Sequence, residues 1–305
     1  MKKINEYFKS MMRGTCLFLL LLSCISAVMA QDSATTQKDV KIKSKPVKNT
    51  FEDIMVIDNQ TLQVPIKKTF EFMLGHRFGT VTNGYKDFYG LAAGANMAFR
   101  FYYTPINNLS LGIAFNLENL IWEGNVKYAF MRQSETGGWP VSITYYGNMA
   151  IDTREKQGNF ISDADRVSYF NQLMVGRKIT EKLSLQVSGS LSYLNNVPGY
   201  IDAEGKVNPL MNNVHFAMEF VGRYKISETF SVIADYDQPL TQHLYNNPHP
   251  SLGLGIEIST KGHTFQLFGT NYGSTLPQYN NFFNQNDYTK GMWLVGFNLS
   301  RRWHL

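Results

Sequence analysis

The sequence predicts an all-β fold, an up-and-down antiparallel transmembrane β-barrel of about twelve strands. Three observations predict it: apolar and polar residues alternate in twelve segments, short turns and long loops alternate between these segments, and only 17% of the 305 residues are charged. A strand that separates lipid from a lumen alternates in this way, and a membrane barrel has short turns at one rim and long loops at the other. Soluble domains carry about 25% charged residues, so the low charge favours a fold whose outer face meets lipid.

Residues 1–30 are predicted to be a signal peptide that is removed from the folded protein. Four basic residues precede an apolar run at 16–22, and a small-residue cleavage site follows at 28–30. The run that ends at Cys24 also resembles a lipoprotein cleavage box, which would instead leave a lipidated Cys24. Both cysteines, Cys16 and Cys24, lie in this segment, so the exported chain is expected to have no disulfide.

Residues 31–68 are predicted to form a periplasmic tail in front of a barrel at 69–305. The formal net charge is +5, but residues 1–50 hold nine of the 29 Lys and Arg and three of the 24 Asp and Glu. The remainder is therefore close to neutral, which does not support a nucleic-acid surface. The lysines of the tail indicate a solvated linker or contact with anionic head groups. Segment 51–65 has enough apolar residues to plug the lumen or to dock beneath it, and an ordinary linker is an equal alternative.

Twelve segments carry the period-two pattern that places successive side chains on opposite faces of a sheet. In 109–115, for example, large apolar residues alternate with Ser, Gly and Ala. After the signal no apolar run is long enough for a transmembrane helix. The predicted strands are, in order, 70–75, 96–101, 109–115, 126–130, 141–151, 167–175, 183–193, 214–220, 230–236, 252–258, 264–268 and 293–305.

The connections between the predicted strands alternate in length. The short ones are TPINN, SETGGW, ITEK, SET and TKGH. The long polar ones are GTVTNGYKD, TREKQGNFISDA, NNVPGYIDAEGKVNPLMNN, PLTQHLYNNPHP and STLPQYNNFFNQND. In an outer-membrane barrel the long loops face outside and the short turns face the periplasm, so both termini are expected to be periplasmic.

A secreted β-sandwich is the alternative that explains strand alternation equally well. It explains the polar phase poorly, because Ser110, Gly112, Ser188, Ser190 and their equivalents are small or uncharged rather than Lys and Glu. Aromatic residues near the segment ends support the barrel modestly, since such residues favour both membrane interfaces.

The last predicted strand is expected to close the barrel. Its apolar phase contains Trp293, Val295, Phe297, Leu299 and Trp303, and only Arg301 interrupts that phase. Pairing of this strand with the first removes two edges whose backbone groups would otherwise be unsatisfied in lipid. Partners implied by this location are outer-membrane lipid and the barrel-assembly machinery.

Several stretches carry a family resemblance across nearly the whole chain from Phe51 on, loops excepted. They are TLQVPIKKTFEFMLGHRFG, PVSITYYGNMAI, QLMVGRKI, GRYKI, GHTFQLFGTN and GFNLSRRWHL. In these stretches the chain resembles an uncharacterised family of membrane-bound β-barrel proteins found in Bacteroidota. The resemblance implies the fold and the location and brings no established activity.

The polar phase of the strands predicts which side chains line the lumen. Glu219 and Arg223 lie about 13 Å apart along one strand, so each is expected to meet a neighbouring strand rather than the other. These charges either pair with one another and fill the lumen, or line a path for polar solutes. The predicted lumen-lining residues are Glu71, Arg77, Arg100, Lys127, Arg166, His215, Glu219, Arg223, Asp235, Asp237, Glu257 and Arg302.

The sequence offers no catalytic, cofactor or metal site. The six histidines have no metal-ligand spacing, and the outward-facing His76 lacks a recognisable serine partner for a barrel lipase. Gly253 and Gly255 lie within a strand and lack the following helix that a phosphate loop needs.

The predicted function is therefore a non-enzymatic outer-membrane role. Twelve strands lie between the eight that side chains fill and the sixteen that enclose a channel. The sequence leaves open a narrow channel for small polar solutes, a filled barrel that is structural or binds a partner, and a secreted binding sandwich.

Overall fold

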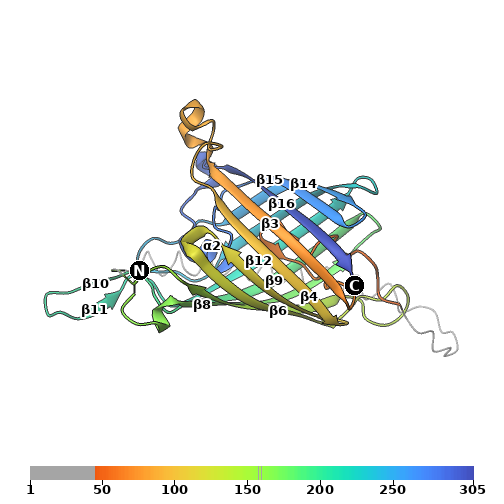
Figure 1. The fold of residues 1–305 in the computed structure, drawn as a ribbon, viewed down its shortest axis with the longest axis horizontal. Helices are drawn as coiled ribbons and strands as arrows, with labels where there is room; N and C mark the ends of the chain where they lie inside the picture. The colour runs from red at the N-terminus through yellow and green to blue at the C-terminus, as the bar shows by residue number, and fades with distance from the viewer. Residues whose placement is uncertain (1–44, 157, 159) are drawn as a thin grey trace, which may run out of the picture. The chain divides into compact units, whose positions relative to one another are not determined.

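The computed structural model describes residues 45–156, 158 and 160–305, so the predicted signal peptide lies outside the described residues. Twelve antiparallel strands form a closed barrel (Figure 1). The predicted fold is therefore confirmed, and the sandwich alternative is wrong. The barrel strands are β3 (Thr69–Thr80), β4 (Asn96–Ile106), β5 (Leu109–Asn116), β6 (Ile121–Met131), β7 (Ser142–Asp152), β8 (Val167–Lys178), β9 (Leu183–Leu194), β12 (Val214–Lys225), β13 (Phe230–Pro239), β14 (Ser251–Thr260), β15 (His263–Thr270) and β16 (Leu294–His304).

The pleat of each strand divides its side chains between lumen and exterior. In β9, Ser184, Gln186 and Ser188 are buried inside, whereas Leu185 is exposed on the outer face. The same alternation recurs along β3, where Glu71 faces inward between two outward phenylalanines. The polar phase of the sequence is thus the inner wall, as a membrane barrel requires.

The closing strand pairs as predicted. β16 is antiparallel to β3 from His304 opposite Thr69 to Leu294 opposite Thr80. Trp303 lies on the outer face with its ring centroid 5.7 Å from that of Phe70. The outward Arg301, which interrupts the apolar phase, stacks on Trp303 with 4.9 Å between guanidinium carbon and ring centroid. This stacking accounts for a charge on the lipid-facing side of the rim.

The two rims differ in their connections, with two departures from the predicted pattern. At the turn rim the connections are 107–108, 132–141, 179–182, 226–229 and 261–262. At the loop rim they are 81–95, 117–120, 153–166, 195–213, 240–250 and 271–293. The connection 132–141 is longer than a tight turn, and its Ser134 pairs with Pro46 of the amino-terminal segment. The connection 117–120 is short although it lies at the loop rim.

The connections at the loop rim contain local structure of their own. They hold the 3-10 turns η1 (Val81–Asp87), η2 (Glu118–Leu120), η3 (Ala164–Arg166) and η4 (Tyr288–Lys290), the hairpin of β10 (Gly199–Ile201) and β11 (Val207–Pro209), and the helix α2 (Pro277–Phe283). Among the residues that the structure describes, no helix is long and apolar enough to cross a membrane.

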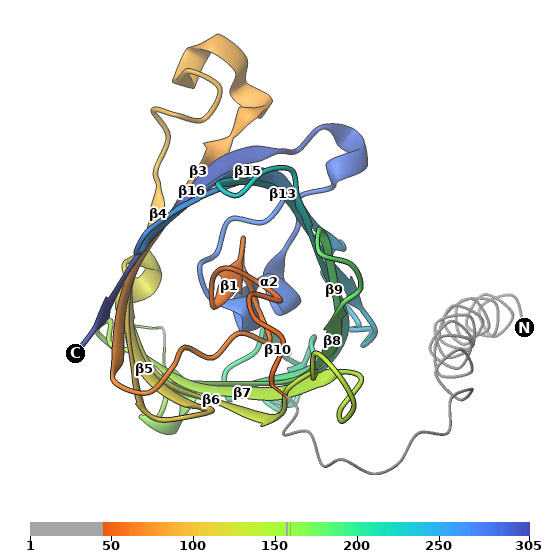
Figure 2. The same cartoon turned by 90° about the vertical axis from the view of Figure 1, so that its right-hand side faces the viewer.

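Two segments from opposite rims fold into the barrel. A small hairpin, β1 (Met55–Val56) and β2 (Asn59–Gln60), precedes the first barrel strand, and α2 belongs to the loop between β15 and β16. Figure 2 shows both at the centre of the ring of strands. The inside of the barrel is therefore where the candidate site is found.

Candidate functional site: the occupied lumen

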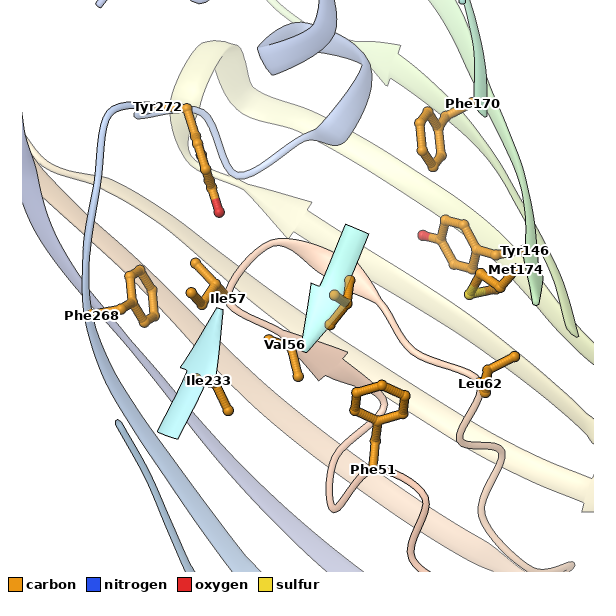
Figure 3. Packing of buried hydrophobic residues seen from close by; sticks show 11 residues of the cluster. Phe51, Val56, Ile57, Leu62, Tyr146, Phe170, Met174, Ile233, Phe268 and Tyr272 are labelled. Atoms are coloured by element: carbon orange, nitrogen blue, oxygen red, sulfur yellow. The ribbon is translucent and has the colours of Figure 1, made fainter. Parts of the chain in front are cut away.

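The lumen hairpin, residues 51–64, is anchored by an apolar cluster. Phe51, Val56, Ile57 and Leu62 are buried against wall residues that include Phe170 (Figure 3). The other members of the cluster are Tyr146, Met174, Val221, Ile233, Phe268 and Tyr272. Full burial of a large apolar side chain contributes about 1.5–3 kcal/mol. The cluster therefore holds the hairpin to apolar positions on several strands of an otherwise polar wall.

Two wall glutamines bind the backbone edges of the lumen hairpin. The Gln266 amide accepts from Ile57 N at 3.1 Å and donates to Met55 O at 2.9 Å. Gln186 does the same, accepting from Leu62 N at 2.9 Å and donating to Gln60 O at 2.8 Å. Each amide thus presents a donor and an acceptor to the hairpin, as a neighbouring strand would. Such pairing is needed because buried backbone groups are costly when unsatisfied.

Further wall side chains bind the carbonyl groups of the lumen hairpin. Lys127 Nζ donates to Ile54 O at 2.8 Å and to Thr61 O at 3.2 Å. Asn298 Nδ2 and Arg77 Nη2 both donate to the carbonyl of residue 57, at 2.7 Å and 3.0 Å. The wall therefore holds the hairpin from several strands at once.

The loop 271–293 fills the lumen from the other rim. Pro277 occupies the first turn of α2, a position that suits proline because its N–H would have no helical partner. The helix then buries Gln278, Asn281 and Phe282. Gln278 and Asn281 donate to wall residues, Gln278 to Asn148 at 3.1 Å and Asn281 to Ser192 at 3.1 Å. A polar helix is buried here because the wall it meets is polar.

The two inserted segments meet inside the barrel. Asn280 Nδ2 of α2 donates to Asp58 Oδ2 at the tip of the lumen hairpin, at 2.6 Å. Arg77 Nη2 lies 3.7 Å from the other carboxylate oxygen of Asp58. Burial raises the pKa of Asp58, and the positive charges of Arg77 and Arg100 oppose that rise. The contact joins the segment from the turn rim to the segment from the loop rim, so the lumen is occupied from both sides.

Ion pairs gather towards the turn rim. Arg302 lies 2.8 Å from Glu71 and 3.3 Å from Asp53, which also accepts a hydrogen bond from Ser300. Arg223 Nε donates to Glu257 at 2.7 Å. These pairs link wall strands to each other, and the Asp53 contact links them to the amino-terminal segment.

Three carboxylates form a separate group beside the hairpin tip. Glu219 and Asp237 are directly opposite each other on β12 and β13, and Asp235 follows on the same face. Asn59 Nδ2 donates to Asp237 at 2.7 Å and to Asp235 at 3.3 Å, and Tyr272 donates to Asp235 at 2.6 Å. Gly253 makes this packing possible, because a Cβ there would lie 2.1 Å from Asp235 Oδ1. Among the described residues no Lys or Arg forms an ion pair with these three carboxylates, and like charges directly opposite are unfavourable.

Most of the predicted lumen-lining residues are buried inside the barrel, and two lie at its rims. Buried within the barrel are Glu71, Arg77, Arg100, Lys127, His215, Glu219, Arg223, Asp235, Asp237 and Glu257. Arg302 faces inward at the turn rim with 23% of its side chain exposed. Arg166 differs from the prediction: it lies in η3, one residue before β8, and donates to the carbonyls of Asp152 and Arg154 in the loop rim. Arg166 also lines the cavity at the loop rim.

The structure brings several of these residues together. It joins Arg302 to Glu71 and Arg223 to Glu257, and it keeps Glu219 and Arg223 apart as expected. Sequence reasoning placed Gln186 on the lumen-facing phase but did not predict its contacts with the hairpin. It missed the other partners supplied by the hairpin and the wall amides, which are Asp53, Asp58, Asn59, Gln172, Gln266 and Asn298. An available signal was the presence of amides in the inward phase of β9, β15 and β16.

His215 lies apart from the charged groups. Its Nδ1 is 3.0 Å from His243 Nε2, and both rings pack on Phe282 of α2, with centroids 5.4 Å and 5.5 Å away. His243 Nδ1 accepts from Asn212 N at 3.1 Å, so its Nε2 carries the proton in the neutral ring. Within the described part of the chain no cluster of three or more His, Cys, Asp or Glu could hold a metal ion.

A cavity of about 700 Å³ opens at the loop rim beside α2. Its lining is rich in amides and includes Asn195, Tyr279 and Asn286, together with Glu118 and Arg154. The Arg154 guanidinium is engaged by Asp152 at 2.7 Å. This cavity therefore lies next to the segment that fills the lumen from the loop rim.

Known proteins share the barrel fold of this chain at low sequence identity. Among solved structures, the chain is similar to the NanC porin (9% identity, 77% of this chain and 99% of that chain covered, TM-score 0.47). It is also similar to an outer membrane channel from Pseudomonas putida F1 (10% identity, 79% and 97% covered, TM-score 0.49) and to the KdgM porin (8% identity, 78% and 99% covered, TM-score 0.43). No curated protein matches it. Residues 51–303 match the family described as the membrane bound beta barrel domain (DUF5777), and the chain therefore belongs to this family of membrane-bound β-barrel proteins.

Proposed function

We propose that the protein is an outer-membrane channel for small polar solutes that is closed in this state by its own lumen hairpin and α2. The observation that carries the proposal is the contact between Asp58 and Asn280, where segments inserted from opposite rims meet. The wall around them is polar and charged, so their withdrawal would leave a hydrophilic path. Closure by inserted segments rather than by a narrow wall makes the closed state reversible in principle.

The proposal includes an orientation in which the long loops face outside and both termini face the periplasm. Under this orientation the lumen hairpin enters from the periplasmic side, where a periplasmic event can pull on the chain that precedes it. A cysteine at Asn208 should react with an impermeant thiol reagent on intact cells, and one at Glu135 should not. The opposite labelling pattern would reverse the assignment of the two sides.

Bilayer conductance tests the channel directly. The full chain should remain closed most of the time, and a variant lacking residues 51–64 should conduct ions. A variant lacking residues 199–209 is the control, because it removes a shorter hairpin from the loop rim and leaves the lumen hairpin and α2 in place. Heat-modifiable gel migration of each variant establishes first that the barrel is folded.

A filled barrel that serves as a scaffold or binds a partner is the second candidate. The eleven-residue apolar cluster around the lumen hairpin favours it, because such burial suits a permanent core better than a mobile plug. The deciding variant lacks residues 51–64 and carries Asn280→Ala and Asn281→Ala, which loosen α2. If this variant folds and still does not conduct ions, the channel proposal is wrong and the scaffold role is supported.

A further inference from the structure

The loop after β3 displays large apolar side chains to the outside. Tyr85 is 80% exposed, Phe88 73%, Tyr89 60% and Leu91 52%. We call residues 81–93 the aromatic loop. Isolated apolar residues at a surface are ordinary, but four large ones in one short loop form a patch of the kind that marks an interaction surface.

The aromatic loop has a defined backbone that maintains this exposure. Phe88 and Tyr89 both have positive φ angles, 54° and 56°, which is uncommon for large side chains. Asp87 stabilises the turn, since its carboxylate accepts from Gly90 N at 2.9 Å and its carbonyl accepts from Ala92 N at 2.9 Å. Tyr89 N also donates to Gly84 O at 2.7 Å. A strained conformation that is held by several hydrogen bonds points to a function for what it displays.

The aromatic loop projects sideways from the barrel. In Figures 1 and 2 it extends outward beyond the ring of strands, whereas the hairpin of β10 and β11 extends along the barrel axis. Both connections lie at the loop rim. The sideways direction carries the aromatic loop over the surface of the surrounding bilayer, and the axial direction carries the other hairpin away from it.

The base of the aromatic loop continues the lipid-facing surface. Phe78, three residues before η1, lies on the outer face with its ring 6.3 Å from that of Phe297. Val81 N donates to Trp293 O at 2.7 Å, so the loop begins beside an aromatic residue at the same rim. Aromatic side chains favour the bilayer interface because the ring is apolar while a hydroxyl or indole N–H can remain hydrated. Lys86, at the same tip, can reach anionic head groups.

We propose that the aromatic loop is a lipid anchor whose side chains at 85, 88, 89 and 91 insert into the interfacial region of the leaflet at the loop rim. The anchor follows from membrane residence and does not depend on whether the lumen conducts. It fixes the depth and tilt of the barrel on the side formed by β16, β3 and β4.

Site-specific quenching tests the anchor. With Cys16 and Cys24 replaced by Ser, a single cysteine at Tyr89 is labelled with bimane and the protein is reconstituted in phosphatidylcholine and phosphatidylglycerol vesicles. Brominated acyl chains should quench this label several-fold more than a label at Tyr200 on the axial hairpin, and aqueous iodide should show the reverse preference. Equal iodide quenching at both positions would place the aromatic loop in water and overturn the proposal.

Two further results complete the test. A label at Tyr85 should lose its quenching by brominated lipid when Phe88→Ser and Tyr89→Ser are combined, while heat-modifiable migration shows that the barrel remains folded. Unchanged lipid quenching in that variant would overturn the role of the aromatic side chains. The Tyr89 label could instead be protected from both quenchers, with the protection rising as the protein-to-lipid ratio rises. That result would show that a second copy of the chain, and not lipid, covers the loop, and it would overturn the proposal.

Discussion

The lumen hairpin and α2 occupy the same barrel by different physical means. The hairpin enters with apolar side chains and has its backbone bound by wall amides. Its cluster unites eleven residues, of which four belong to the hairpin and one, Tyr272, to the loop that carries α2. The α2 segment relies on side-chain hydrogen bonds, and its apolar anchors Leu276 and Phe282 belong to two smaller clusters. Apolar burial contributes more than a net hydrogen bond of about 0.5–1.5 kcal/mol. We therefore expect α2 to be the looser of the two.

The largest expected effect concerns the buried ion pair between Arg223 of β12 and Glu257 of β14. Arg223→Ala leaves Glu257 buried without its partner, and Glu257 also binds Gln266, which holds the hairpin. Removal of one member of a buried pair costs about 3–5 kcal/mol in free energy of unfolding. Urea unfolding in detergent should show this loss, and Glu257→Gln added to Arg223→Ala should recover part of it. An unchanged midpoint together with unchanged conductance would argue against both a structural and a channel role for this pair.

A smaller effect is expected from the apolar anchor of the hairpin. Phe51→Ala removes a fully buried ring from the eleven-residue cluster, at a cost of about 3 kcal/mol, and should raise the fraction of time that the barrel conducts. Phe283→Ala on α2 is the matched control, because that ring is partly exposed and should change stability little. Equal effects of the two substitutions would remove the contrast between the segments.

The contact between the lumen hairpin and α2 should contribute less to stability than the apolar anchor of the hairpin. Asn280→Ala deletes the amide that donates to Asp58, and the loss of a hydrogen bond to a charged group costs about 1.5–3 kcal/mol. A label on α2 should become more mobile while one on the hairpin does not, because Arg77 still faces Asp58. Gln285→Ala, on the exposed side of the same loop, should leave both labels unchanged.

The strands of the barrel wall were predictable from the sequence, whereas the segments that fill the lumen were predictable only in part. Alternation with period two depends on the pleat alone, so the strands followed from local pattern. The pairing of β16 with β3 followed from the requirement that a barrel in lipid leaves no unpaired edge. The contacts of the hairpin depend on register around the whole barrel, since Ile57 and Gln266 are 209 residues apart. The sequence therefore marked 51–65 as a possible plug without identifying which amides receive it.

The helix α2 and the position of Arg166 show why other features of the lumen were not predicted. The segment STLPQYNNFFNQND reads as a polar loop, because asparagine favours turns and is a weak helix former. It is helical here because Asn148, Ser168 and Ser192 of the wall bind its amides. Arg166 was assigned to the lumen by extending the period of β8 by one residue, and strand ends are the least certain feature of such patterns.

The smallest expected effect is a pH response confined to α2. Burial lowers the pKa of His243, which is hydrogen-bonded to His215 and packed with it on Phe282. A histidine with a lowered folded pKa contributes stability that is complete above its unfolded pKa of about 6.5 and is lost as pH falls towards the folded value. A fluorophore at Phe283→Cys should therefore gain mobility below about pH 6.5, and His243→Gln should reduce this change. A fluorophore at Gln63→Cys on the hairpin should report no change over the same range, because His215 and His243 contact α2 and not the hairpin. Equal responses at both positions would show that the two segments move together, and the difference in their anchoring would then have no consequence for opening.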